Sequence, residues 1–176
     1  MTMKYRDAIK QAMEALARDQ RTIFLGYNVL YGSKAYGTLA GIPDDRCLET
    51  PVAENLMAGL AIGMSLAGYR PVLFYERHDF VLNALDGIVN HLDKIESMSR
   101  GQFKTPVIIR ATVGGCVPLH PGPQHTQDFT QAFRSMVTFP VLDLTTPAEV
   151  QEAYQMAEQL DSPIMMVERR DLYDRT

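Results

Sequence analysis

Hydrophobic positions along the chain alternate between two periods. Apolar residues recur at helical spacing over 8–16, and a short β-rich run follows at 22–25, closed by Gly26. The alternation continues toward the C-terminus. It predicts further helices over 53–67, 80–98, 129–133 and 147–160, and further strands over 46–49, 70–75, 106–111, 141–144 and 164–167.

The predicted strands are continuous apolar runs separated by helices. Such runs are typical of strands buried on both faces, and helical crossovers between successive strands make those strands parallel. The sequence therefore predicts an α/β fold, a three-layer α/β/α arrangement with a mostly parallel central sheet. No repeat or linker interrupts residues 1–176, so we expect a single domain.

Two segments show no periodicity and are long enough to be functional: the Gly-rich 31–43 and the Gly-, Pro- and His-rich 112–126. In open parallel sheets, ligands bind beyond the carboxyl ends of the strands. The loops that follow predicted strands, 26–43, 50–54, 76–80 and 112–127, are therefore the places to search for chemistry.

Composition excludes several classes of protein. The chain has 176 residues, of which 46% are apolar, and this length supports a core without metal or disulfide. A formal charge of -4 with scattered basic residues makes nucleic acid an unexpected partner. The longest apolar stretch, 56–67, is shorter than the roughly 20 residues that span a bilayer, and the N-terminus does not resemble a signal peptide, so we expect no membrane segment and a cytoplasmic location.

Neither cysteine suggests a metal site. Cys47 and Cys116 lie in apolar sequence without the Cys or His spacing of metal ligands, which favours a reduced compartment. We predict no metal bound by this chain.

Glu54 stands in the first turn of the most apolar predicted helix. A helix N-terminus favours its anion, whereas apolar surroundings favour its neutral form, and such a carboxyl can share a proton with a ring nitrogen. An ordinary first-turn acid is the alternative. Gly59 and Gly63, four apart on one face, allow another backbone to approach closely or serve packing only.

Phe80 follows the strand 70–75 by a few residues and can reach the same rim as Glu54. An aromatic ring there can stack on a flat heterocycle, or it can be a core residue that opens its helix. We expect His78, two residues earlier, to be a polar residue at the rim.

The loop 112–126 contains His120 and His125 between Gly and Pro residues, which suits acid or base catalysis near neutral pH. We favour His125, because residues 126–128 open the next helix and fix its position. A pair of metal-binding histidines and a thiol hydrolase using Cys116 are competing interpretations. The chain has no GxGxxG or GxxxxGK[ST] phosphate-binding motif.

Five segments, taken together, resemble a known family. The order and spacing of these segments are similar to those of the pyrimidine-binding domain of thiamine-diphosphate enzymes. The similarity is greatest to the beta subunit of 2-oxo acid dehydrogenase E1 components and smaller to transketolase and deoxyxylulose-phosphate synthase. The segments are ETPVAENLMAGLAIGMSLAGYRPV, FYERHDFVLNALDGIVNHLDKIE, QFKTPVIIRATVGG, PQHTQDF and SPIMMVERRDLY.

The resemblance implies roles for three residues. Glu54 matches the glutamate that hydrogen-bonds N1′ of the aminopyrimidine and so favours the form that removes the thiazolium C2 proton. Phe80 matches an aromatic that stacks on the aminopyrimidine. His125, in a QHTQ motif, matches the histidine that contacts substrate, which makes Glu54 and His125 the expected catalytic residues.

The resemblance also implies a partner. The family holds the diphosphate and Mg²⁺ with a GDG…N motif on a different domain, and this sequence has no GDG. We expect a separate subunit to carry that domain and the metal, in a heterotetramer with two copies of each chain.

Two departures from the E1 beta pattern bear on the reaction. Residues 26–29 read Gly-Tyr-Asn-Val where many E1 beta chains have an acidic pair, and the similarity ends at Thr176, where those chains continue into a C-terminal domain. The predicted reaction is decarboxylation of a 2-oxo acid with transfer of the acyl or aldehyde unit to an acceptor. The alternatives are a split transketolase, for which His78, His120, Arg77 and Lys34 are candidate phosphate donors, and a non-catalytic scaffold or regulator.

Overall fold

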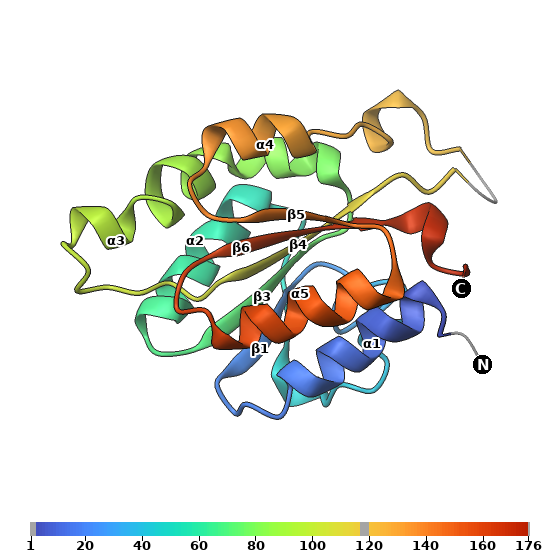
Figure 1. Ribbon diagram of the computed structural model, residues 1–176, viewed down its shortest axis with the longest axis horizontal. Coiled ribbons are helices and arrows are strands. Elements are labelled where there is room, and N and C mark those ends of the chain that lie inside the picture. The colour runs from blue at the N-terminus through green and yellow to red at the C-terminus, as the bar shows by residue number, and fades with distance from the viewer. Residues whose placement is uncertain (1–2, 117–119, 176) are drawn as a thin grey trace.

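The structure, a computed structural model, describes residues 3–116 and 120–175. Its centre is a six-stranded sheet in the order β2-β1-β3-β4-β6-β5, and every pairing is parallel. Helices cover both faces of this sheet (Figure 1), so the predicted three-layer α/β/α class is confirmed. The strands are β1 (Thr22–Gly26), β2 (Cys47–Glu49), β3 (Arg70–Tyr75), β4 (Ile108–Val113), β5 (Val141–Leu144) and β6 (Ile164–Arg169).

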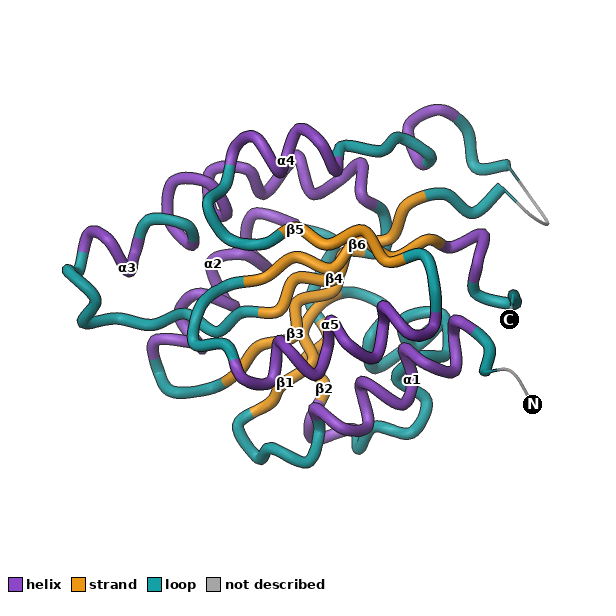
Figure 2. Tube along the Cα trace, in the orientation of Figure 1, coloured by secondary structure: helices purple, strands orange, loops and turns teal. Residues whose placement is uncertain are grey.

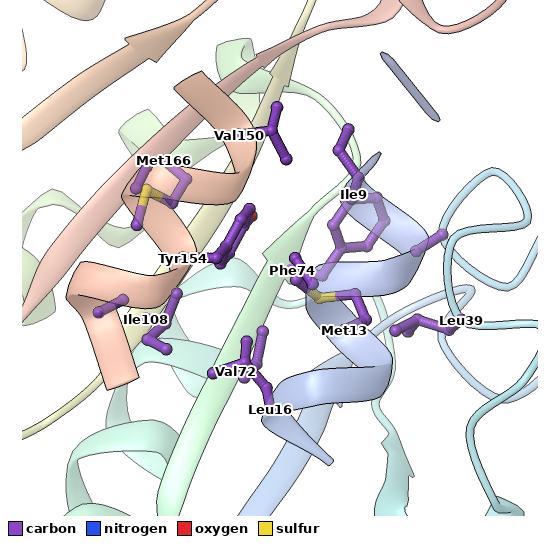
Figure 3. Close-up of a cluster of buried hydrophobic side chains, with 14 of the residues drawn as sticks. Ile9, Met13, Leu16, Leu39, Val72, Phe74, Ile108, Val150, Tyr154 and Met166 are labelled. Carbon is purple, nitrogen blue, oxygen red and sulfur yellow. The ribbon is translucent and has the colours of Figure 1, made fainter. Parts of the chain in front are cut away.

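Each face of the sheet has its own core. On one face, α1 (Tyr5–Leu16) packs beside α5 (Pro147–Gln159); Figure 3 shows Ile9 and Met13 of α1 meeting Phe74 of β3. The other face is covered by α2 (Glu54–Leu66), by η2 and η3 between residues 78 and 92, and by α4 (Thr130–Met136). A short helix, α3 (Ile95–Met98), projects beyond the sheet (Figure 1).

The continuous apolar strands follow from this burial on both sides. Within β3, Val72 and Phe74 enter the core under α1 and α5, whereas Leu73 and Tyr75 enter the core under α2. Successive side chains of a strand point to opposite faces, so a strand covered on both faces has no polar alternation.

The six predicted strands all form, with shifted ends. Strand β2 begins at Cys47 because Asp44–Arg46 forms a single 3₁₀ turn, η1. Strand β4 begins at Ile108, two residues later than predicted, since Pro106 has no N–H to donate to the sheet.

The predicted helix over 80–98 is wrong as one continuous α-helix. A 3₁₀ helix, η2 (His78–Ala84), is followed by a π-helix, η3 (Asp86–Leu92), and then by α3. This segment packs tightly against α2, since a Cβ on Gly87 would lie 2.9 Å from Ala58 Cβ. Local spacing alone does not report such a contact.

The segment 31–43 forms turns without helix or strand, as expected of a loop. Three successive residues, Lys34, Ala35 and Tyr36, have φ between 46° and 56°, the left-handed region that such residues rarely adopt. The turn carries the Tyr36 hydroxyl to the carbonyl oxygen of Glu76, 3.2 Å away.

Because the strands are parallel, their carboxyl ends share one edge of the sheet. Strand β6 runs toward the side of the molecule on which the C-terminus lies (Figure 2), and the loops after the other strands gather at the same edge. In the part of the chain that the structure describes, no helix has the length and apolar character needed to cross a bilayer.

Candidate active site

Glu54 is the first residue of α2 and is only 6% exposed. Its carboxylate Oε2 accepts a hydrogen bond from Asn83 Nδ2 of η2 at 3.3 Å, and its carbonyl oxygen accepts one from the Tyr75 hydroxyl at 3.2 Å. None of the ion pairs among the described residues includes Glu54. Glu54 is thus a buried acid without a cationic partner among the described residues.

Two buried tyrosines make the surroundings of Glu54 weakly polar. Burial raises the pKa of the Tyr27 and Tyr75 hydroxyls, and the negative charge of Glu54 raises both pKa values further. Both phenols therefore remain protonated near neutral pH. Tyr27 belongs to the 26–29 segment that departs from the E1 beta pattern.

Phe80 and His125 lie against each other. Phe80 comes from η2 and His125 from the short 3₁₀ turn η4 (Pro123–His125), and their rings meet edge to face with centroids 5.1 Å apart. Since Asn83 of η2 also contacts Glu54, this helix links all three predicted site residues. The structure thus brings together Glu54, Phe80 and His125 around one element.

Asp79, which sequence reasoning missed, anchors the loop that carries His125. The carboxylate of Asp79 is buried, and its Oδ1 accepts from both the backbone N and the side-chain Nε2 of Gln127, at 3.1 and 3.0 Å. Gln127 stands two residues after His125. The only sequence signal was the position of Asp79 next to Phe80.

The expectation that His78 is a rim residue is wrong, because its side chain has no exposed surface. The imidazole stacks on Phe133 of α4 with centroids 5.4 Å apart, and neither ring nitrogen has a hydrogen-bond partner among the described residues. Burial lowers the pKa of His78 to about 4, opposed by the Asp128 carboxylate 3.9 Å from Nδ1. The sequence could not show that α4 folds over this position.

His120 is exposed and its Nδ1 accepts a hydrogen bond from the Gly122 backbone N at 3.0 Å. No ring contact or hydrogen bond in the described part of the chain joins it to Glu54, Phe80 or His125. Its substrate role therefore stays a prediction without supporting geometry.

Metal chemistry has no evident site here. Within residues 3–116 and 120–175, no group of three or more His, Cys, Asp or Glu side chains is placed to hold a metal ion. Cys47 and Cys116 are both free thiols and half-buried.

The segment after β1 is anchored by the carboxylates of Glu49 and Glu76. Backbone N–H groups of residues 28–31 donate to the Glu49 carboxylate over 2.6 to 3.3 Å. Asn28 adopts φ 58°, and its Nδ2 donates to Glu76 Oε2 at 2.9 Å. Asparagine tolerates this left-handed conformation, which was the one sequence signal for the turn.

Four cavities, of about 470, 330, 370 and 500 Å³, lie away from these residues. None of the four is lined by Glu54, Phe80 or His125. The candidate site lies outside these cavities, at the rim of the sheet.

Comparisons with known proteins agree with one another. The family described as "Transketolase, pyrimidine binding domain" matches residues 1–176. Pyruvate dehydrogenase E1 component subunit beta, mitochondrial, of Caenorhabditis elegans is 31% identical over 99% of this chain and 51% of its own length, and that of Dictyostelium discoideum is 32% identical over 96% and 48%. The 2-oxoisovalerate dehydrogenase subunit beta of Bacillus subtilis is 29% identical over 97% and 53%.

Among solved structures, a chain titled "Split gene transketolase, inactive beta4 tetramer" superposes with a TM-score of 0.75 at 20% identity, covering 96% of this chain and 51% of that one. At this identity the likeness bears on the fold. The chain spans about half the length of the curated relatives that it matches.

Proposed function

The chain belongs to the transketolase pyrimidine-binding domain family, and from this premise we propose that residues 1–176 form one domain that supplies the aminopyrimidine half of a thiamine-diphosphate enzyme's active site. The observation that carries the proposal is the buried Glu54 carboxylate, which has no cationic partner among the described residues and is linked through η2 to Phe80.

The residues present fit an aminopyrimidine. Such a ring needs an acid at a ring nitrogen and an apolar surface against its face, and Glu54 and Phe80 have those chemistries. Asn83 holds Oε2 of Glu54, which leaves Oε1 to meet the ring nitrogen. When bound, thiamine diphosphate supplies the nucleophilic carbon that attacks a substrate carbonyl.

Glu54 holds and returns a proton at its carboxyl group. The buried Tyr27 and Tyr75 limit the access of water, so a hydrogen bond from this carboxyl to a bound ring nitrogen would be stronger than in solvent. Tyr27, with its raised pKa, presents a neutral hydroxyl where many E1 beta chains have an acid. This difference supports a substrate or acceptor distinct from that of a standard E1 component.

In this proposal His125, whose ring lies against Phe80, is the residue that contacts the substrate. An imidazole held there can donate a proton to the reacting carbonyl oxygen or accept one from it. The Asp79–Gln127 hydrogen bonds fix the backbone two residues away, which limits how far the ring can drift.

The proposed reaction is decarboxylation of a 2-oxo acid with transfer of the acyl or aldehyde unit. The names of the relatives at 29 to 32% identity, subunits of pyruvate and 2-oxoisovalerate dehydrogenases, favour it over the transfer of a two-carbon ketol. The association of Glu54, Phe80 and His125 around η2 argues against a scaffold that has lost its chemistry.

A second subunit completes the proposed site. It carries the GDG…N motif, the diphosphate and Mg²⁺, in a heterotetramer with two copies of each chain in the cytoplasm. The outward face of α2 supports an interface: Leu56 is 49% and Leu66 is 48% exposed, and a Cβ on Gly59 or Gly63 would meet nothing within 4 Å.

Co-purification tests this proposal. The tagged chain should retain a second chain that contains GDG…N, and the pair should decarboxylate a 2-oxo acid only with thiamine diphosphate and Mg²⁺. Gly63→Leu has room within the chain, so it should fold normally yet lose the partner, whereas Glu152→Leu on α5 should keep it. Tight binding of the coenzyme by this chain alone would contradict the proposal.

A further inference from the structure

The cavity of about 470 Å³ opens at the opposite end of the sheet from Glu54. It lies between α1, α5 and the first residues of β1 and β3, and its volume is in the range of small-molecule sites. Six of its eight lining residues carry polar or charged side chains: Arg18, Asp19, Thr22, Arg70, Gln155 and Glu158.

Two buried donors in this lining have no hydrogen-bond partner among the described residues. Arg70 is 6% exposed and Thr22 is not exposed at all, yet Arg70 Nε and Thr22 Oγ1 are both unpartnered. Such groups are uncommon in folded proteins, because each loses its hydration without compensation. They are neighbours, since Thr22 pairs with Arg70 across β1 and β3.

The carboxylate beside Arg70 does not satisfy it. Asp19 Oδ2 lies 3.9 Å from Arg70 Nε, which is too long for a hydrogen bond. Arg21 occupies both oxygens of Asp19 with bonds of 2.7 to 3.1 Å and, chiefly through them, lowers the pKa of Asp19 to about 2. Asp19 is therefore an ionised carboxylate that pairs mainly with Arg21 and more weakly with Arg70.

The rest of Arg70 is fixed in place. Its Nη1 donates to the carbonyl oxygens of Ala157 and Glu158 at 2.9 Å, which anchors the guanidinium at the C-terminal end of α5. The Nε edge of a guanidinium that cannot turn away is a preorganised donor for an oxygen of an anion. Arg18 and Gln155 add further donors in the same cavity.

From these contacts we propose that the cavity binds a small oxyanion, a carboxylate or a phosphate group, through Arg70 Nε, the Thr22 hydroxyl and Arg18. Two negative charges in the lining oppose the anion and limit the affinity: Glu158, and Asp19, which pairs mainly with Arg21. The site is separate from the candidate active site and does not depend on the proposed function, because its residues contact neither Glu54 nor Phe80 in the described hydrogen bonds.

Titration of the full chain with inorganic phosphate and with acetate, followed by thermal melting at constant ionic strength with NaCl as reference, tests this site. We expect a saturable rise in melting temperature with one of these anions; phosphate identifies a phosphate site, and acetate identifies a carboxylate site. No saturable rise beyond that with chloride for either anion would overturn the proposal.

Three variants sharpen the test without removing Arg70, which supports α5. Thr22→Val replaces an unpartnered hydroxyl by a methyl group. The variant should therefore fold at least as well as the unaltered chain, and its Kd for the anion should rise by about fivefold. Arg18→Gln should raise the Kd for the anion by about threefold, and Glu158→Gln should lower it by about threefold. An unchanged Kd in Thr22→Val, or weaker binding in Glu158→Gln, would contradict the assignment.

Discussion

Two buried glutamates differ in what surrounds their charge. Glu168 of β6 is fully buried between the sheet and α5, and its two oxygens accept from Arg110 at 2.8 and 3.0 Å. The hydroxyls of Tyr154 and Tyr173 donate to the same carboxylate at 2.7 and 2.6 Å. Glu54 is nearly as buried, yet its carboxylate accepts only from Asn83 within the described residues.

The difference distinguishes an acid that stabilises the fold from one that we propose binds the coenzyme. Burial opposes ionisation of Glu168, but Arg110 and the donors around it hold the pKa of this carboxyl below its ordinary value. Both carboxylate oxygens of Glu168 accept hydrogen bonds from other residues of this chain. In Glu54 only Oε2 accepts a hydrogen bond within the described residues, and we propose that Oε1 meets the coenzyme, so removal of each acid should affect different properties.

The largest expected effect is on turnover. In the reconstituted complex, Glu54→Gln keeps the size of the side chain but removes the acid, and it should lower kcat by about 10²- to 10⁴-fold with little change in melting temperature. Glu54→Ala should do the same. Steady-state kinetics with saturating coenzyme measure it.

The matched control is Glu152→Gln, an exposed glutamate of α5 that should leave kcat unchanged. Near-normal activity of Glu54→Gln would remove the distinction between the two buried acids.

The next effect is on stability. Arg110→Met leaves Glu168 as a buried charge without its cation, and it should lower the free energy of unfolding by about 3–5 kcal/mol in urea titrations. Adding Glu168→Leu should recover much of this loss, because the uncompensated charge is removed.

Arg6→Met serves as the comparison for an exposed ion pair. Arg6 Nη1 lies 3.4 Å from Asp174 Oδ1, and 41% and 70% of the two side chains are exposed, so the variant should cost less than about 1 kcal/mol. A loss as small as this in Arg110→Met would show that the buried network is not structural.

The burial of His78 predicts a smaller effect on stability, which depends on pH. The folded-state pKa of about 4 lies below the unfolded value of about 6.5, so the unfolded chain binds more protons between these pH values. The stability contributed by the neutral imidazole is therefore complete above pH 6.5 and decreases as the pH falls toward 4. From pH 8 to pH 5 the loss should be about 2 kcal/mol.

Urea titrations of His78→Leu between pH 8 and pH 5 should show a flatter dependence than those of the unaltered chain. His91→Leu, at an exposed position, serves as the control for the loss of a histidine. Equal slopes in all three proteins would contradict the burial of a neutral His78.

The smallest expected effect concerns the loop that carries His125. His125→Ala should lower kcat by about 10-fold or more, to an extent that depends on the substrate. Asp79→Ala releases Gln127 and should lower kcat in the same direction, by about threefold to tenfold, with KM nearly unchanged.

A double variant tests whether Asp79 acts through His125. If it does, Asp79→Ala should add little to the loss already caused by His125→Ala. Fully multiplicative losses would show that Asp79 has an independent role, and Asp86→Ala on the exposed side of η3 provides the control.

Much of the fold was determined by the sequence itself. Continuous apolar strands such as β3, separated by periodic helices such as α1, identified a parallel sheet with two covered faces, and each predicted strand is present. Glu54 was placed correctly at the start of α2 because a helix boundary is a local property. The sequence also predicted that Phe80 lies at the same rim, since Phe80 follows a neighbouring strand.

Only the tertiary structure decided where polar side chains find partners. Arg110 and Glu168 are 58 residues apart, Asp79 and Gln127 are 48 apart, and α4 covers His78 from a distant part of the chain. Periodicity reports whether a position is buried, because burial on a regular element repeats along that element. It does not report which atoms meet across the core, since those distances depend on how helices of different origin pack on a common sheet.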